Sequence, residues 1–184
     1  FEQSLMKELN VGANMMTGTI PAEIGLSSTL TDIYLFGNKF SGSIPHLGNM
    51  PLVKFHGQGN AFTGMLPFDY DFGGAWVDSL REWWVYDNKL TGSISDNLGF
   101  ISNLEDIRIN KNHLTGSIPE SISELQQLFR FDVQSNKLTG SIPDSIGELP
   151  QLRDVFFQYN KFDGEVPSSL CLLESMELLE ADCL

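Results

Sequence analysis

A sequence unit returns along this chain at a nearly fixed interval, and that interval decides the fold. Residues 104–119 read LEDIRINKNHLTGSIP, residues 128–143 read LFRFDVQSNKLTGSIP and residues 152–167 read LRDVFFQYNKFDGEVP. Aligned on one asparagine, successive units are 24, 22, 28, 24, 24 and 24 residues apart. Such a period predicts a solenoid, in which each unit buries its apolar face against its neighbours. The aligned positions are Asn14, Asn38, Asn60, Asn88, Asn112, Asn136 and Asn160.

The first half of each unit alternates apolar and polar residues, which predicts a short strand with one buried face. Ile107 and Ile109 form the inward pair of one unit, and Phe131 and Val133 form that of the next. The asparagine then turns the chain. We expect its amide to bond backbone groups of its own coil and of the neighbouring coil that the bend would otherwise leave unpaired. The asparagines should therefore form a structural column.

A glycine stands four residues after each of these asparagines, and a proline follows three residues later in every unit except one, where Ser95 takes its place. A glycine at this fixed position indicates a positive φ or a close backbone contact. Proline prevents a regular hydrogen-bond ladder, so the convex side is predicted to be extended or 3₁₀-like. Short helical turns are expected at residues 121–125 and 145–149.

Two intervals depart from the common period. The interval of 22 residues shortens the convex side around residues 46–51, and the interval of 28 residues inserts residues 68–78, FDYDFGGAWVD, before a strand at residues 80–85. An insertion of this kind more often folds back and buries a residue such as Phe72 or Trp76 locally. The alternative is that its aromatic and acidic residues form a small contact surface.

The net charge of −13, from 11 basic and 24 acidic residues, argues against nucleic acid or an anionic membrane as a partner. No apolar run reaches the roughly 20 residues needed to cross a bilayer, so we expect no direct membrane contact by this segment. The repeats run nearly end to end, which predicts a single domain over residues 1–184 with about seven full repeats and partial ends. Both polar end caps are missing, and signal, anchor and caps are expected outside this segment.

The unit LxxLxLxxNxLTGSIP closely resembles the plant-type leucine-rich repeat, with its asparagine, glycine and Ile-Pro in register over seven units. The resemblance implies a leucine-rich-repeat solenoid: a right-handed curved superhelix with a concave parallel β-sheet and a convex side of 3₁₀ or short helices. The family includes ectodomains of receptor kinases, receptor-like proteins and polygalacturonase-inhibiting proteins. The C-terminal string LCLLESMELLEADC also resembles the end of the repeat array in diatom leucine-rich-repeat proteins.

No catalytic site, metal site or cofactor is predicted. His46, His56 and His113 occupy unlike positions in different units, so they are expected to be separate surface residues rather than ligands of one metal. Cys171 and Cys183 are the only cysteines. They form a disulfide in an oxidising compartment, or Cys183 pairs with a residue beyond this segment, or Cys171 is a buried free thiol at a position where other units carry glycine.

Outward-facing strand residues form two columns across the concave sheet. Residues of one column on neighbouring parallel strands lie about 4.8 Å apart, so consecutive aromatic positions should form one continuous patch. The core does not need these rings, because the inward positions are already filled. Clustered exposed aromatics favour a recognition site, and rings that only stabilise the sheet are the alternative. The candidate ligand-binding residues are Tyr34, Phe36, His56, Trp84, Tyr86, Arg108, Asp132 and Phe156.

These features favour a non-enzymatic module that recognises a protein, peptide or glycan through its concave face. The polar residues next to the rings suit a peptide or a glycan equally. The resemblance places the module in a larger extracellular or cell-surface protein, with a receptor-like role in signal transduction at a membrane as one expectation. The alternatives are a structural or adhesive spacer array without a discrete ligand, and a protein inhibitor of a cell-wall hydrolase.

Overall fold

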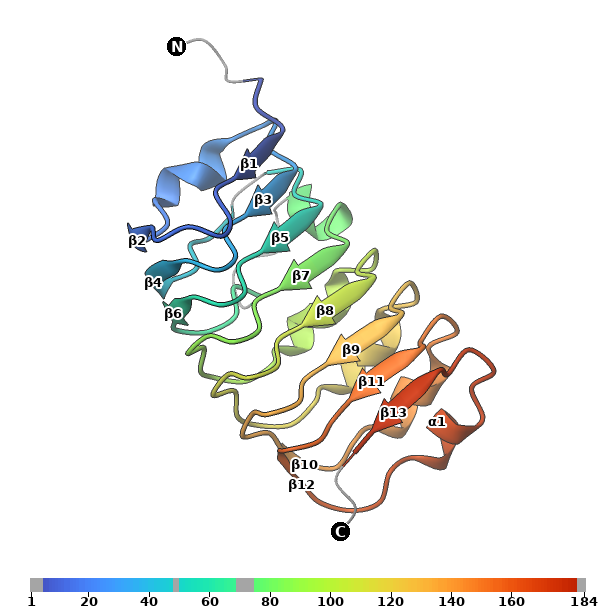
Figure 1. Cartoon of the computed structure of the whole chain (residues 1–184). Helices are drawn as coiled ribbons and strands as arrows, with labels where there is room; N and C mark the ends of the chain where they lie inside the picture. The colour runs from blue at the N-terminus through green and yellow to red at the C-terminus, as the bar shows by residue number, and fades with distance from the viewer. Residues whose placement is uncertain (1–4, 48–49, 69–74, 182–184) are drawn as a thin grey trace.

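The computed structural model describes residues 5–47, 50–68 and 75–181, which form a stack of coils (Figure 1). Strands of successive coils join an eight-stranded parallel sheet, in which Ile33 lies opposite Phe55 and Phe55 lies opposite Trp83. The predicted solenoid with a parallel sheet on one side is confirmed. Its strands, in spatial order, are β1 (Glu8–Asn10), β3 (Asp32–Tyr34), β5 (Lys54–His56), β7 (Glu82–Trp84), β8 (Asp106–Arg108), β9 (Arg130–Asp132), β11 (Asp154–Phe156) and β13 (Leu178–Glu180).

Short helices form the side opposite the sheet, as the prolines predict. The helix η4 (Glu120–Glu124) begins at the residue after Pro119. The pyrrolidine ring of this proline fixes φ, and the missing N–H cannot continue a hydrogen-bond ladder between strands. Ser95, in place of proline, accepts a hydrogen bond from the backbone N–H of Asn97 and so caps the following helix. No helix in the described ranges is long and apolar enough to span a bilayer. The helices are η1 (Ala22–Leu26), η2 (Ala75–Asp78), η3 (Asp96–Phe100), η4 (Glu120–Glu124), η5 (Asp144–Glu148) and α1 (Ser168–Cys171).

Short strands also pair along one lateral edge, just after the asparagine turn (Figure 1). The glycine of each unit lies here. Gly116 has a φ of 77°, and a Cβ at this position would lie 3.2 Å from the Cβ of Ser93 in the preceding coil. Glycine thus meets both expectations at this position, a left-handed backbone and a close approach. The edge strands are β2 (Thr17–Gly18), β4 (Lys39–Ser43), β6 (Ala61–Thr63), β10 (Thr139–Gly140) and β12 (Lys161–Phe162).

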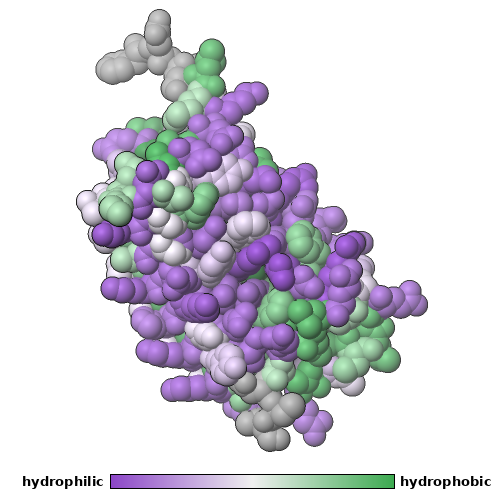
Figure 2. Space-filling model, viewed as in Figure 1, coloured by the Kyte–Doolittle hydropathy of each residue, from purple (hydrophilic) through white to green (hydrophobic). Residues whose placement is uncertain are grey.

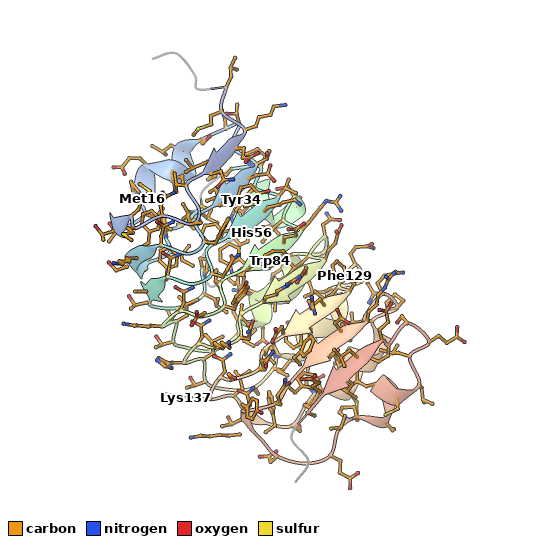
Figure 3. All side chains as sticks on the ribbon, viewed as in Figure 1. Met16, Tyr34, His56, Trp84, Phe129 and Lys137 are labelled. Atoms are coloured by element: carbon orange, nitrogen blue, oxygen red, sulfur yellow. The ribbon has the colours of Figure 1, made fainter. Side chains whose placement is uncertain are left out.

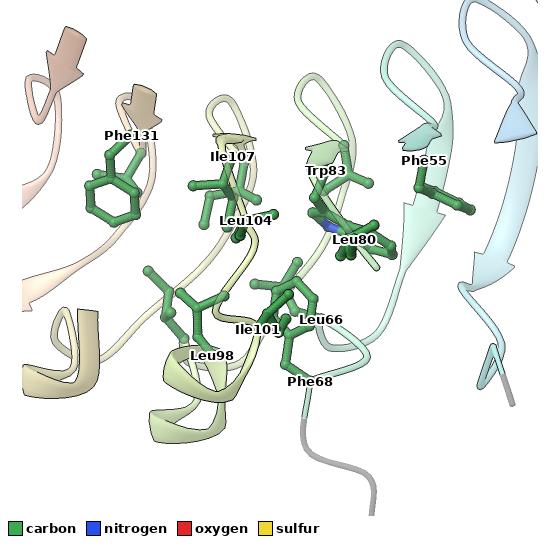
Figure 4. Close-up of a cluster of buried hydrophobic side chains, with 14 of the residues drawn as sticks. Phe55, Leu66, Phe68, Leu80, Trp83, Leu98, Ile101, Leu104, Ile107 and Phe131 are labelled. Atoms are coloured by element: carbon green, nitrogen blue, oxygen red, sulfur yellow. The ribbon is translucent and has the colours of Figure 1, made fainter. Parts of the chain in front are cut away.

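The inward side chains fill a continuous core between the sheet and the helices (Figure 4). The ring of Trp83 stacks on Phe55 at 4.5 Å between centroids and meets the edge of Phe68 at 5.3 Å. Trp76 of the insertion is buried, as the folded-back alternative predicts. Phe72 lies outside the described residues. The insertion therefore adds to the core at the point where the interval between units is longest.

The asparagine side chains connect neighbouring coils. The amide of Asn112 donates to Val85 O of the preceding coil at 3.0 Å and to Ile109 O of its own coil at 3.0 Å. Its oxygen accepts from the backbone N–H of Leu90 at 2.9 Å. Asn14 differs, because its amide donates to Val11 O and Gly12 O of its own coil and its side chain is exposed. Asn38, Asn60, Asn88, Asn136 and Asn160 repeat the pattern of Asn112.

Candidate ligand-binding site

The concave face is the outward face of the eight-stranded sheet, and four candidate residues lie in register on four neighbouring strands. Tyr34 on β3 is opposite His56 on β5, which is opposite Trp84 on β7 and then Arg108 on β8. Figure 3 shows the three labelled rings following one another across these strands. The alternation of each strand turns these side chains outward, because the residues on either side of them fill the core.

The four side chains form a continuous stack, which we call the aromatic stack (Tyr34, His56, Trp84 and Arg108). His56 lies parallel to Trp84, with 3.8 Å between ring centroids and 5° between planes. Tyr34 meets His56 edge-on at 5.0 Å, and the Arg108 guanidinium carbon lies 4.0 Å from the Trp84 centroid. Since the imidazole and the guanidinium come from strands on opposite sides of β7, they cover both faces of the indole. Trp84 therefore presents its ring edge, not a ring face, to a ligand.

Charged residues two positions earlier on the same strands hold the aromatic stack in place. Glu82 accepts from Lys54 Nζ at 2.7 Å and lies 2.8 Å from His56 Nε2. Burial lowers the pKa of His56, although its hydrogen bond to Glu82 acts in the opposite direction. The side chain is thus held in its neutral form to lower pH than a free histidine. As a neutral ring it donates to Glu82 through Nε2.

Arg108 is fixed by the residue two positions before it. Its Nε donates to both carboxylate oxygens of Asp106 at 3.0 and 3.2 Å, and its Nη2 donates to one of them at 2.6 Å. Asp106 is only 2% exposed, so this ion pair is shielded from water. A paired and stacked guanidinium loses little further freedom when a ligand arrives, which favours binding by preorganisation.

The remaining candidate residues lie beside the stack. Phe156 lies farther along the same column, where the Arg130 guanidinium carbon is 5.2 Å from its ring centroid. Phe36 lies over Gly12, at which an added Cβ would lie 2.5 Å from the ring. Tyr86 is half-buried in the same column as Phe36. The rings therefore gather mainly at β3, β5 and β7, with Phe156 apart from them.

Asp132 stands between the aromatic stack and Phe156. Its carboxylate accepts two long bonds, both of 3.3 Å, from the backbone N–H and the Nε2 of Gln134. Burial raises the pKa of Asp132. Gln158 extends this network by donating to Gln134 Oε1 at 3.0 Å. The second column of the face is thus a run of amides rather than rings at β9 and β11.

A column of charged residues, each directly before the first inward residue of its strand, was not predicted from the sequence. We call it the charged column. Its members lie on the same face as the rings because they are two positions before them, so the same alternation would have found them. They orient the guanidinium and the imidazole of the aromatic stack. The main members are Lys54, Glu82, Asp106, Arg130 and Asp154.

The expectation of three separate surface histidines is wrong for His56, which is 8% exposed because Tyr34 and Trp84 enclose its ring. His46 and His113 are exposed. Across the described ranges, no three histidine, cysteine or acidic side chains are grouped so as to hold a metal ion.

Cys171 is exposed, so the expectation that it is buried is wrong. Its counterpart Gly99 packs against the next coil, where an added Cβ would lie 2.6 Å from Ser121 O, and Gly147 packs likewise against Ser169. No described coil follows Cys171 to cover it. Cys183, its candidate disulfide partner, lies outside the described residues.

The chain was then compared with known proteins. Residues 103–125 and 127–149 match the family model described as Leucine Rich Repeat. No curated protein matches the chain. The fold is similar to that of the plant peptide hormone receptor RGFR1 in complex with RGF2, with a TM-score of 0.84 and 31% identity over 91% of this chain and 27% of that one.

Two further structures extend the comparison. The Arabidopsis receptor kinase HAESA, in complex with the peptide hormone IDA and the co-receptor SERK1, has a TM-score of 0.74 and 28% identity over 95% of this chain and 33% of that one. The leucine-rich-repeat protein LIC12759 of Leptospira interrogans, at 23% identity, has a TM-score of 0.77 over 96% of this chain and 43% of that one, which shows the fold alone. This chain spans 27% and 33% of the two receptor chains.

Proposed function

Because this chain is a plant-type leucine-rich-repeat protein, we propose that it is a non-catalytic recognition module that binds a peptide or protein on its concave face. The observation that carries the proposal is the aromatic stack. Its four side chains lie outside the core, and two of them, His56 and Arg108, are fixed by Glu82 and Asp106 before any ligand arrives. Rigid aromatic and arginine side chains are the residue types that dominate binding energy at protein interfaces.

The surroundings of the stack favour a polar ligand that spans several coils. Figure 2 shows that the viewed side of the molecule is mainly hydrophilic. Of the stack, Tyr34 and Trp84 remain half-exposed, whereas His56 is enclosed between them. An extended peptide laid along the column would meet a different coil about every 4.8 Å. Each coil then contributes one or two side chains to recognition.

The comparisons support a protein or peptide as the ligand class. RGFR1 and HAESA were each solved with a peptide partner, and HAESA also with a co-receptor. By this analogy we place the module outside the cell, as part of a longer receptor-like protein. The whole protein's signalling role and its co-receptor belong to the same proposal.

The proposal is tested by binding of the full chain to arrays of secreted proteins, synthetic peptides and cell-wall glycans. A Tyr34→Ala/Trp84→Ala/Tyr86→Ala variant removes three outward rings, and Phe100→Ala removes one exposed ring from η3 on the opposite side. We expect a peptide or protein ligand whose affinity falls at least tenfold in the triple variant and is unchanged in the control. Melting temperatures of all three proteins must agree for the comparison to hold.

Other outcomes would redirect the proposal. Equal binding by the triple variant would move the site away from the concave rings. A glycan as sole ligand would contradict the ligand class, and capture of a hydrolase with loss of its activity would favour an inhibitor. Absence of any ligand on all three arrays would favour a spacer array.

A further inference from the structure

The concave face carries more acid than base, and its bases are already paired. Two columns of the face carry cations: the charged column and the column of the aromatic stack. Among the described residues, each of their three cations bonds to a carboxylate of the same face: Lys54 to Glu82, Arg108 to Asp106 and Arg130 to Asp154. Four acids have no cation within 4.0 Å in the described part of the chain, namely Glu8, Asp32, Asp132 and Glu180. A negative face without an available cation attracts a positively charged partner.

Asp132 differs from the other three acids because it is buried. It is 8% exposed, whereas Glu8 and Glu180 are exposed and Asp32 is half-buried and bonded to the Thr31 hydroxyl. Asp106, one coil earlier, is equally shielded but has three short contacts to Arg108. A buried carboxylate without a cation carries a desolvation penalty that a bound cation would offset.

The neighbouring cations form their ion pairs with other carboxylates and not with Asp132. Arg108 is bonded to Asp106 and stacked on Trp84, and Arg130 is bonded to Asp154 at 3.3 Å and lies over Phe156. Both guanidiniums lower the energy of the Asp132 carboxylate at a distance, yet burial still raises its pKa. The charge of Asp132 is therefore only partly compensated within the chain.

An acceptor without a hydrogen-bond partner lies on the adjacent coil. Asn110 is 7% exposed, and its side-chain oxygen has no hydrogen-bond partner among the described residues. Backbone bonds from Ile109 N to Asp132 O and from Lys111 N to Gln134 O place Asn110 beside the Asp132–Gln134 pair. Buried polar atoms without a partner are rare and call for an explanation.

We propose that Asp132 and Asn110 form a subsite for a lysine or arginine side chain of a peptide ligand. The inference rests on the proposed function and specifies the chemistry of its ligand. An ammonium or guanidinium carries several donors and one positive charge, and so satisfies both the carboxylate and the amide oxygen. Two oxygen ligands are too few for a calcium ion, which takes six to eight. Trp84 offers no open ring face to a sugar, because both of its faces are covered.

The first experiment needs no knowledge of the natural ligand. N-acetyl-L-arginine methylamide is titrated into the ¹⁵N-labelled full chain, and the uncharged isostere N-acetyl-L-citrulline methylamide is titrated in parallel. We expect saturable shifts of the Asn110 side-chain amide and of the Asp132 and Gln134 backbone amides with the arginine probe. At least tenfold weaker binding is expected with citrulline. Equal shifts with both probes, shifts confined to other residues, or no shift at all would each overturn the proposal.

Variants separate this subsite from general charge attraction. Asp132→Asn preserves shape and removes one negative charge, and Asp96→Asn makes the same change at the start of η3 on the opposite side. We expect arginine-probe binding to weaken at least tenfold in the first and to stay unchanged in the second. Equal weakening of probe binding in both variants would show that binding depends only on the net charge of the chain, and would overturn the proposed subsite. Because the probe is a single amino acid, loss of this subsite is distinguishable from failure of the array-binding test of the whole face.

Discussion

Replacing Asn112 by alanine tests the role of the asparagine column most directly. The side chain is 4% exposed and makes bonds on both sides of a coil boundary. After truncation, Val85 O keeps a bond from the amide of Asn88, and Ile109 O keeps one from Asn136. The backbone N–H of Leu90, a buried residue, keeps no partner. One orphaned donor costs about 1–3 kcal/mol, which sets the expected loss of unfolding free energy.

The matched control is Asn14→Ala. Asn14 is exposed and bonds only to its own coil, so water can replace its contacts and the expected cost is below about 1 kcal/mol. Urea unfolding followed by tryptophan fluorescence gives the two free energies, and hydrogen exchange of the Leu90 amide reports the local effect. An Asn112→Ala variant no less stable than Asn14→Ala, with an unprotected Leu90 amide already in the parent chain, would refute the reasoning.

Three further predictions concern the packing and the titratable groups. Gly99→Ala should cost about 1–3 kcal/mol in urea unfolding, because its Cβ would lie 2.6 Å from the backbone oxygen of Ser121, and a loss below 0.5 kcal/mol would contradict that contact. Since burial lowers the pKa of His56, the free energy of unfolding should fall as pH drops from about 6.5 toward the lower pKa of the folded state. The His56→Gln variant should show a flatter dependence on pH than the parent chain. Parallel profiles of the two proteins would exclude His56 as the source. Since burial raises the pKa of Asp132, the charged form of this residue is disfavoured in the folded state, and Asp132→Asn should raise the melting temperature at pH 7. A lower melting temperature in the variant would show that the hydrogen bonds from Gln134 stabilise the carboxylate more than burial destabilises it.

The sequence predicted the fold well because the period links residues far apart in the chain. Once the asparagines are aligned, Trp84 must lie beside His56, and the structure places these rings in parallel contact. The same alignment places Arg108 on the other side of Trp84 but does not say that its guanidinium stacks on the indole. Arg108 reaches Trp84 only because Asp106 fixes its guanidinium, a contact that depends on side-chain rotamers rather than on register.

Burial on the concave face was also not readable from alternation. Alternation says that His56 and Asp132 point outward, yet each is 8% exposed. For His56 the cause is that Tyr34 and Trp84 of the adjacent coils enclose its ring. The exposed state of Cys171 has the opposite cause: a position buried by the next coil in the middle of the array has no described coil to bury it here. In both cases the neighbouring coil, not the residue type, sets the exposure.

The asparagine bonds also determine how the molecule responds to force. Apart from Asn14, each side chain links backbone atoms of adjacent coils only, so a pull on the two ends loads the coils in series rather than together. The boundary between coils with the weakest contacts separates first, which lowers the tension. The other boundaries stay intact until the tension rises again. A chain held by its ends should lengthen in a sawtooth of nearly equal steps, each releasing one period of about 24 residues. As a tether, it would limit tension while most of its length stays folded.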